Sequence, residues 1–232
     1  MKAPIYEIFS SIQGEGLLIG KRQIFVRFTG CNLDCNYCDS EKSRFVENGY
    51  LLTVDEVIKK IKDLYSDDLD SISFTGGEPT IYFDFINEVS SKIDYKIMIE
   101  TNGTLPENID KLNKIDYVSL DIKLPEHFND SSFEDIFRNE IKSLNLLMSR
   151  SINVYCKLVV LPSTKINSFE TIIKRLSKDV LNNKELQIII QPSSPINDWK
   201  NLNSHLFRFS EIVGKYFEVS IIPQVHKFLN IE

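Results

Sequence analysis

The chain has few cysteines and no long apolar run, and both features narrow what it can do. Only four cysteines occur in 232 residues, which excludes a scaffold held together by disulfides. No apolar stretch approaches the roughly 20 residues of a membrane-spanning helix, so we expect no membrane span. No N-terminal targeting segment is recognisable, and we therefore expect a cytoplasmic protein with reduced thiols.

An excess of basic charge is also missing. The sequence has 27 Lys and Arg residues against 33 Asp and Glu residues, which gives a net charge of −6 and a pI near 5.3. Binding along a phosphate backbone needs the opposite balance, so we expect no nucleic-acid partner. No linker, repeat or low-complexity segment interrupts the chain, and the sequence predicts one domain over residues 1–232.

The hydrophobic pattern alternates between short β-type runs and helical periods. Strands are predicted at 24–29, 71–75, 96–100, 117–121, 154–161, 186–191 and 217–222. Helices are predicted after a capping box at 53–56, then at 83–93, 133–148, 169–181 and 206–216. This alternation is typical of an α/β fold with parallel βαβ units, whose ligands gather at the carboxyl ends of the strands.

A compact cysteine triplet is the most informative motif. Cys31, Cys35 and Cys38 have the spacing Cys-x3-Cys-x2-Cys, and soft thiolate ligands favour zinc, copper(I) or iron–sulfur centres. Three thiolates on a [4Fe-4S] cluster would leave one iron open, which favours catalysis. A zinc site with Cys156 as a distant fourth ligand is the main alternative. Cys156 lies in an alternating apolar segment, which favours a buried core thiol.

Two motifs resemble the radical S-adenosylmethionine (SAM) superfamily. The triplet, with Tyr37 before its last cysteine, is similar to the cluster motif of that superfamily. Gly76-Gly77-Glu78-Pro79, behind a β-type run, is similar to the element that receives the SAM amino group. Two glycines allow close backbone approach to a ligand, and a carboxylate suits an ammonium group.

The chain as a whole resembles the 7-carboxy-7-deazaguanine synthase family, a branch of that superfamily. The resemblance rests on the segments 13–16 (Gln-Gly-Glu-Gly), 27–31 (Arg-Phe-Thr-Gly-Cys), 38–40 (Cys-Asp-Ser), 100–104 and 226–231. It implies an incomplete TIM-like barrel and a carbon–nitrogen lyase of queuosine or archaeosine biosynthesis. The implied reaction turns 6-carboxy-5,6,7,8-tetrahydropterin into 7-carboxy-7-deazaguanine with loss of ammonia. A proline that is common in the family is replaced around Gln23.

The resemblance also implies a set of site residues. Substrate would contact Ile12, Gln13, Gly14, Glu15, Arg27, Thr75 and the terminal Glu232. SAM would contact Tyr37, Cys38, Asp39, Gly77, Glu78, Asp121, Ile122, Lys123 and Gln191. The cluster would be bound by Cys31, Cys35 and Cys38, and Mg²⁺ by Ser40. No side chain is expected to act as the catalytic acid or base, because the radical comes from SAM. A flavodoxin- or ferredoxin-type reductant and a homodimer are implied as well.

Simpler interpretations remain for several of these residues. Arg27 could be a solvated strand charge, Ser40 a helix cap, and Asp121 with Lys123 a surface pair. His127 is expected on the surface. Two other functions also remain: an activating enzyme for glycyl-radical proteins, and a non-catalytic zinc or redox module.

Overall fold

The computed structural model describes residues 1–128, 133–150, 152–181 and 185–231. Its centre is one nine-stranded sheet in the order β3-β1-β2-β4-β5-β6-β7-β8-β9. The strands are β1 (Lys2–Ile12), β2 (Arg22–Phe28), β3 (Tyr50–Thr53), β4 (Leu69–Gly76), β5 (Lys96–Thr101), β6 (Tyr117–Asp121), β7 (Asn153–Val160), β8 (Gln187–Pro192) and β9 (Glu218–Ile221).

The parallel arrangement predicted from the sequence is confirmed from β2 onward. Strands β2 and β4 to β9 pair in parallel, whereas β1 pairs antiparallel with both β2 and β3. The sequence did not predict β1 or β3. In β1 the register shifts between Ile5 and Glu7, and Pro4 stands just before, so the strand has no clean alternation.

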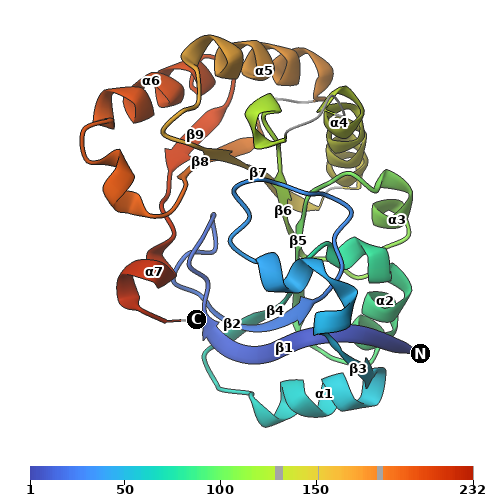
Figure 1. The fold of residues 1–232 in the computed structure, drawn as a ribbon. Helices are drawn as coiled ribbons and strands as arrows, with labels where there is room; N and C mark the ends of the chain where they lie inside the picture. The colour runs from blue at the N-terminus through green and yellow to red at the C-terminus, as the bar shows by residue number, and fades with distance from the viewer. Residues whose placement is uncertain (129–132, 151, 182–184, 232) are drawn as a thin grey trace.

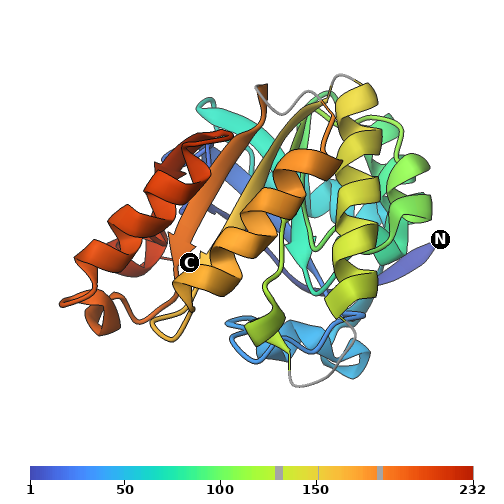
Figure 2. The ribbon, with the colours of Figure 1, turned by 90° about the horizontal axis from the view of Figure 1, so that it is seen from above.

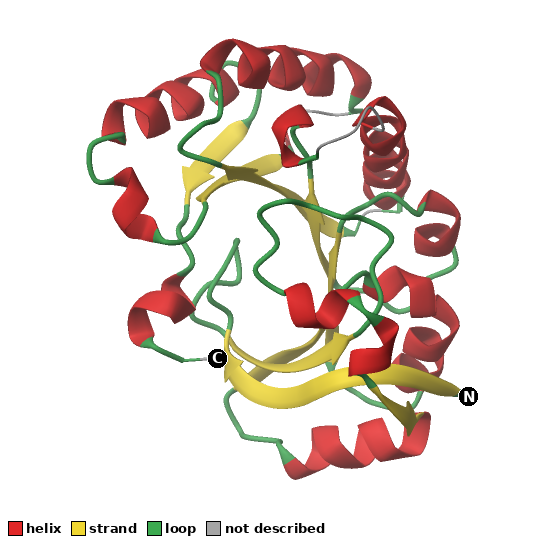
Figure 3. Cartoon of the chain, viewed as in Figure 1, coloured by secondary structure: helices red, strands yellow, loops and turns green. Residues whose placement is uncertain are grey.

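The α-helices are α1 (Val54–Asp63), α2 (Phe83–Ser91), α3 (Pro106–Asp110), α4 (Phe133–Ser149), α5 (Ile166–Asp179), α6 (Asn203–Val213) and α7 (Val225–Leu229). Helices α1 to α6 lie on the convex outside of the curved sheet (Figures 1 and 3). Helix α1 begins at the expected capping box, in which Thr53 and Glu56 bond reciprocally. Figure 2 shows α4, α5 and α6 side by side on the outer face.

The sheet curves without closing, because β3 and β9 stand at its two ends. The architecture is therefore the incomplete TIM-like barrel that the sequence predicted. The loop after β2 crosses the open interior, and α7 lies in the gap between β9 and the β1–β2 hairpin (Figure 1). Among the described residues, no helix is both long and apolar enough to cross a membrane.

Alternation along the strands separates a core face from a site face. In β7, Cys156, Leu158 and Val160 belong to the hydrophobic core under the helices, while Lys157 and Val159 border the interior cavity. Successive side chains in a strand point to opposite faces, so neighbouring residues serve different purposes. Other strands place polar groups on the cavity in the same way: Arg27, Thr75, Glu100, Asp121 and Gln191.

Candidate active site

A cavity of about 260 Å³ opens at the carboxyl ends of the parallel strands. It brings together most of the residues that the sequence nominated. Those that border it are Ile12, Gln13, Gly14, Glu15, Arg27, Cys31, Cys35, Tyr37, Cys38, Asp39, Ser40, Thr75, Gly77, Asp121, Lys123 and Gln191.

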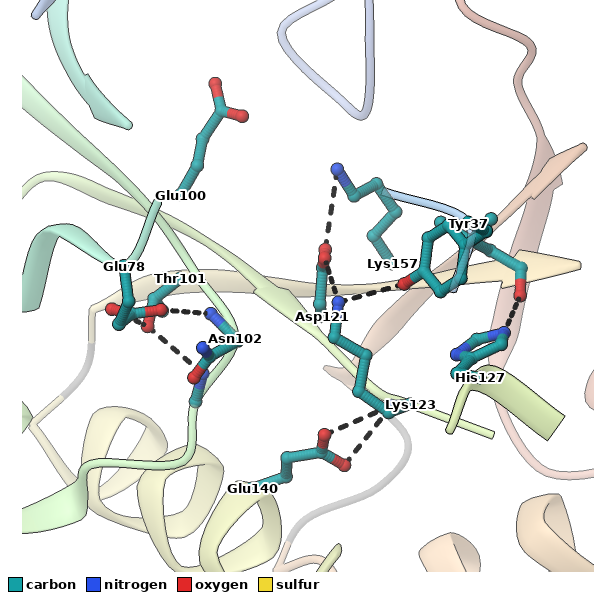
Figure 4. Close-up of polar contacts among 12 residues, drawn as sticks. Tyr37, Glu78, Glu100, Thr101, Asn102, Asp121, Lys123, His127, Glu140 and Lys157 are labelled. Carbon is teal, nitrogen blue, oxygen red and sulfur yellow. Dashed lines mark hydrogen bonds and ion pairs between the residues drawn. The ribbon is translucent and has the colours of Figure 1, made fainter. Parts of the chain in front are cut away.

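Two nominated residues that the structure describes do not border the cavity. Glu78 is fully buried behind its wall, where Asn102 N donates to Oε2 at 2.7 Å and Thr101 Oγ1 donates to Oε1 at 2.8 Å (Figure 4). Burial raises the pKa of the Glu78 carboxyl, although the hydroxyl and backbone donors act against that rise. The Ile122 side chain lies in the helix-side core, and Glu232 lies outside the described residues.

The three cysteine side chains of the triplet face the same cavity. The backbone N–H of Leu33 donates to the Cys31 thiol, and that of Ser40 donates to the Cys38 thiol. Such donors favour the thiolate form. A metal–thiolate centre is stabilised by N–H donors of this kind to its ligand sulfur atoms.

Burial raises the pKa of the Cys35 thiol to about 11, and the Lys123 ammonium opposes that rise. The thiols of Cys31 and Cys38 are shifted upward for the same reason. Without metal, all three are therefore protonated at neutral pH. Metal binding must release these protons, which makes assembly of a centre dependent on pH.

The zinc alternative lacks a preformed ligand set among the described residues. No group of three or more His, Cys, Asp or Glu side chains converges on one ion position within the part of the chain that the structure describes. Cys156, the candidate fourth ligand, is fully buried on the helix side of the sheet. Three thiols that face one cavity without meeting at one point suit a cluster, in which each thiolate binds a different iron.

Asn102 is a neighbour of the triplet that the sequence did not single out. Its Nδ2 lies 4.0 Å from Cys31 Sγ and donates to Asn32 Oδ1 at 3.0 Å. Thr104 Oγ1 donates to Asn102 Oδ1 at 2.6 Å. The asparagine therefore ties the end of β5 to the cysteine loop. Its place in the segment 100–104, just after a strand, was the available signal.

A chain of alternating charges crosses the floor of the cavity (Figure 4). Lys157 Nζ lies 2.6 Å from Glu15 Oε2 and 3.4 Å from Asp121 Oδ1. Asp121 Oδ2 is 2.8 Å from Lys123 Nζ, which donates to the Tyr37 hydroxyl at 2.9 Å. The Lys123 side chain is only 7% exposed, so the interpretation of Asp121 and Lys123 as a surface pair was wrong.

Lys157 is the most important residue that the sequence reasoning missed. Burial opposes the charged form of Glu15, but the Lys157 ammonium and the hydrogen bonds from Lys157 and Gln224 together lower the pKa of that carboxyl. Lys157 thus connects the expected substrate side, at Glu15, with the expected cofactor side, at Asp121. Lys157 directly follows Cys156 in a predicted strand, so the two side chains point to opposite faces. If Cys156 lies in the core, Lys157 must face the other side, and this was the available signal.

His127 is fully buried, so the expectation of a surface histidine was wrong. Its ring centre lies 4.3 Å from that of Tyr37. Leu124 N–H donates to Nδ1 at 3.0 Å, and Nε2–H donates to Val159 O at 3.1 Å. Burial lowers the pKa of His127 to about 3, and the imidazole is therefore neutral. Asn36 N–H donates to His127 O at 3.0 Å and so joins the cysteine loop to this residue.

Arg27 borders the cavity and is already paired on one side. Its Nη1 lies 2.6 Å from Glu7 Oε1, and the guanidinium stands 5.2 Å from the centre of the Phe9 ring. The side chain is 30% exposed, so it is neither freely solvated nor enclosed. The ring and the carboxylate together fix the direction of the guanidinium.

The Gln13 side chain makes its hydrogen bonds within the protein. Its Nε2 donates to Gln23 Oε1 at 3.0 Å and to Glu100 Oε1 at 2.9 Å, while its Oε1 accepts from Glu15 N–H at 3.0 Å. Gln23 is fully buried and donates to Ser71 Oγ at 2.8 Å. Gln13 therefore shapes its own loop by a buried amide network.

Ser40 stands before the short 3-10 helix Glu41–Arg44 but makes no side-chain cap bond to it. The interpretation of Ser40 as a cap was therefore wrong. Its Oγ borders the cavity and has a long contact of 3.4 Å to Asp39 Oδ1.

The segment after β9 forms one side of the cavity. Gln224 and Lys227 donate to Asp39 Oδ2 at 2.8 and 2.9 Å. Burial opposes the charge on Asp39, yet these two donors lower the pKa of that carboxyl to about 2. Neither donor was nominated from the sequence, which identified only the family tail that begins at His226.

The cavity wall also offers positions for a bound organic cofactor. Gln191 is buried at the cavity, and its Oε1 has no hydrogen-bond partner among the residues that the structure describes. A buried, unpaired acceptor is costly unless a ligand or water pairs with it. At Gly77, a Cβ atom would lie 2.1 Å from Gly30 O, so only glycine allows this close passage of the backbone.

Comparison with known proteins agrees with this geometry. The radical SAM superfamily profile matches residues 25–176. The chain thus belongs to the radical SAM superfamily, which implies a [4Fe-4S] cluster and SAM as cofactors. The thiols, their N–H donors and the unpaired Gln191 acceptor fit these groups.

Sequence relatives define the branch. The chain is 44% identical to 7-carboxy-7-deazaguanine synthase of Methanothermobacter thermautotrophicus, over 100% of this chain and 98% of the relative. It is 35% identical to the protein of that name from Methanocaldococcus jannaschii, over 98% and 99%. Within the superfamily, it belongs to the 7-carboxy-7-deazaguanine synthase family. The crystal structure of QueE from Escherichia coli has the same fold, with a TM-score of 0.66, 19% identity, and 95% and 94% coverage.

Proposed function

We propose that the chain converts 6-carboxy-5,6,7,8-tetrahydropterin to 7-carboxy-7-deazaguanine with release of ammonia. The observation that carries the proposal is that three cysteine thiols, Arg27 and the segment Gln13–Glu15 all border one cavity. Relatives with this named activity, matched over nearly their full length, support it. When bound by the three cysteines and the SAM-side residues of the cavity, the cluster and SAM would supply the radical chemistry that the reaction needs.

The substrate carboxylate pairs with Arg27 in this proposal. Glu7 contacts Nη1, so the carboxylate takes the guanidinium edge formed by Nε and Nη2. Two parallel charge-assisted hydrogen bonds fix both the position and the plane of the carboxylate. The Phe9 ring limits movement of the guanidinium on one face.

The heterocycle lies against the loop of Ile12, Gln13, Gly14 and Glu15, with Thr75 opposite. Gln13 acts mainly by holding the loop, because its side chain already has partners at both ends. The pterin edge therefore meets backbone groups of this loop and the Thr75 hydroxyl. The terminal Glu232 remains a further proposed substrate contact.

SAM is bound by Tyr37 to Asp39, Gly77, Asp121 to Lys123 and Gln191. The unpaired Gln191 Oε1 is a proposed acceptor for a SAM donor group. Glu78 accepts hydrogen bonds from Thr101 and Asn102, behind the cavity wall. Because its carboxylate does not face the cavity, its proposed contact with the SAM amino group requires the Glu78 side chain to turn.

Ser40 Oγ binds Mg²⁺ together with water and substrate oxygens. Hard cations take oxygen ligands, and Mg²⁺ keeps several waters, so one protein ligand suffices. We further propose a flavodoxin- or ferredoxin-type reductant, a homodimer and a cytoplasmic location. An activating enzyme for glycyl-radical proteins is not favoured, because the full-length relatives carry the synthase name.

Anaerobic turnover tests the function directly. Reconstituted protein is incubated with SAM, a reductant and the carboxypterin, and the deazaguanine is sought by mass spectrometry. Arg27→Ala should raise the substrate KM about tenfold or more, since each hydrogen bond to a charged group contributes about 1.5–3 kcal/mol. Arg27→Lys should recover only part of the loss.

Arg22→Ala is the matched control, because Arg22 lies on the same strand, donates to Ser10 and does not border the cavity. Its KM should equal that of the unchanged protein. Absence of the deazaguanine with an intact cluster would overturn the function. Loss of the cluster in Arg27→Ala would show a structural role for Arg27 instead.

A further inference from the structure

We propose that Gln224 is a positioning residue that holds the substrate loop (residues 13–16) and the magnesium loop (residues 38–40) in register. The proposal rests on the function given above. In this arrangement one buried amide couples the binding of the substrate to the binding of Mg²⁺. Gln224 lies far from both loops in the sequence and reaches them through the segment after β9.

A single nitrogen atom of Gln224 serves both loops. Its Nε2 donates to Glu15 Oε1 at 2.7 Å and to Asp39 Oδ2 at 2.8 Å. A primary amide nitrogen has two hydrogens, so each carboxylate receives one. The residue is only 7% exposed, and water has little access to replace either bond.

The orientation of the amide is fixed by a third contact. Ser194 Oγ donates to Gln224 Oε1 at 2.5 Å. A reversed amide would turn its oxygen toward two carboxylates, which is unfavourable. Ser194, on the turn after β8, therefore sets the direction in which Gln224 donates.

Charge is balanced around this bridge without any contribution from Gln224. Lys157 Nζ lies 2.6 Å from Glu15 Oε2, and Lys227 Nζ lies 2.9 Å from Asp39 Oδ2. Glu15 and Asp39 are thus each already paired with a cation. The amide adds a directional link between them, which a further cation could not supply with the same geometry.

The backbone of the tail follows the substrate loop as well. Val225 N–H donates to Gly14 O at 2.9 Å. The His226 ring packs so closely on Gly14 that a Cβ atom there would lie 2.1 Å from Nδ1. Asp39 directly precedes Ser40, so a fixed Asp39 also fixes the proposed magnesium ligand.

Hydrogen–deuterium exchange on the cluster-free protein tests the coupling without any turnover. Gln224→Leu removes both donors, and we expect amides of both loops to exchange about tenfold faster, the equivalent of one hydrogen bond to a charged group. Ser194→Ala should produce a smaller change in the same two loops. Gln187→Leu is the control, because Gln187 makes an exposed hydrogen bond of the same type to Glu218. In this variant, residues 13–16 and 38–40 should exchange as in the unchanged protein.

Binding measurements on the reconstituted protein complete the test. Gln224→Leu should raise the carboxypterin KM and the half-saturating Mg²⁺ concentration together, by about tenfold. Faster exchange in only one loop, or a rise in only one of the two constants, would overturn the coupling. If the unchanged protein makes no deazaguanine, the proposed function fails, and the exchange experiment still decides the role of Gln224.

Discussion

Replacing Lys157 by methionine gives the sharpest test of the charged cavity floor. The change removes the cation that Glu15 and Asp121 share, but keeps the length and most of the apolar stem of the side chain. Asp121 retains Lys123 at 2.8 Å, whereas Glu15 retains only the neutral Gln224 donor at 2.7 Å. The perturbation therefore leaves one carboxylate, Glu15, buried without a cation.

The magnitude follows from burial at this pair. The side chains of Lys157 and Glu15 are 10% and 17% exposed and lie 2.6 Å apart. Removing one partner of a buried ion pair costs about 3–5 kcal/mol. We take the low end, about 3 kcal/mol, because the Gln224 bond persists. For a chain of this size that predicts a Tm about 6–12 °C lower.

Thermal unfolding of the cluster-free protein measures this effect, with pH as an internal check. The pKa of Glu15 is lowered from 4.5 in the folded state, so its charge stabilises the fold above that pH, and the stabilisation is lost as pH falls through the folded pKa. The difference in Tm between Lys157→Met and the unchanged protein should therefore become smaller below about pH 4.5. Adding Glu15→Gln to Lys157→Met should restore most of the stability.

Lys174→Met is the matched control, because the Lys174–Glu170 pair is exposed on a helix and should contribute less than about 1 kcal/mol. A Tm change for Lys157→Met no larger than this control would refute the reasoning. A Tm difference between Lys157→Met and the unchanged protein that stays constant with pH would refute it as well.

Three further outcomes are expected. Alanine at any cysteine of the triplet should abolish absorbance near 400 nm after reconstitution, whereas Cys156→Ala should keep it; loss of colour in Cys156→Ala would instead identify a fourth ligand. Ser40→Ala should shift the Mg²⁺ dependence of turnover to higher concentration with SAM binding retained, and an unchanged titration would remove Ser40 from the site. The His127 imidazole should show no titration by NMR between pH 5 and 8, since its pKa is about 3; a midpoint near 6.5 would show that it is not buried.

The sequence predicted the parallel strands and the rim on which the site stands, because both depend on local patterns. Motifs at strand ends, such as Cys31 to Ser40 and Gly77, converge once the strands are parallel. The residues that were missed depend on contacts distant in sequence. Lys157 meets Glu15 only when the barrel curves, and Gln224 meets Asp39 only when the tail closes the gap.

His127 shows the same limit from the opposite direction. A histidine that follows Pro125 and Glu126 looks solvated, and no local pattern in the sequence indicates the cysteine loop that covers it. The loop supplies Tyr37 against the ring and Asn36 on its carbonyl. Burial here is a tertiary effect and cannot be read from local hydrophobicity.

The division of each strand into a core face and a site face restricts how the gene can vary in length. Insertion or deletion of one residue within β7 would exchange the two neighbours, turning Cys156 toward the cavity and Lys157 into the apolar layer under the helices. Such a change would damage folding and chemistry at once. Length variation is therefore expected in the connections remote from the rim, such as the loops between the helices and the strands that follow them, while strand lengths stay constant.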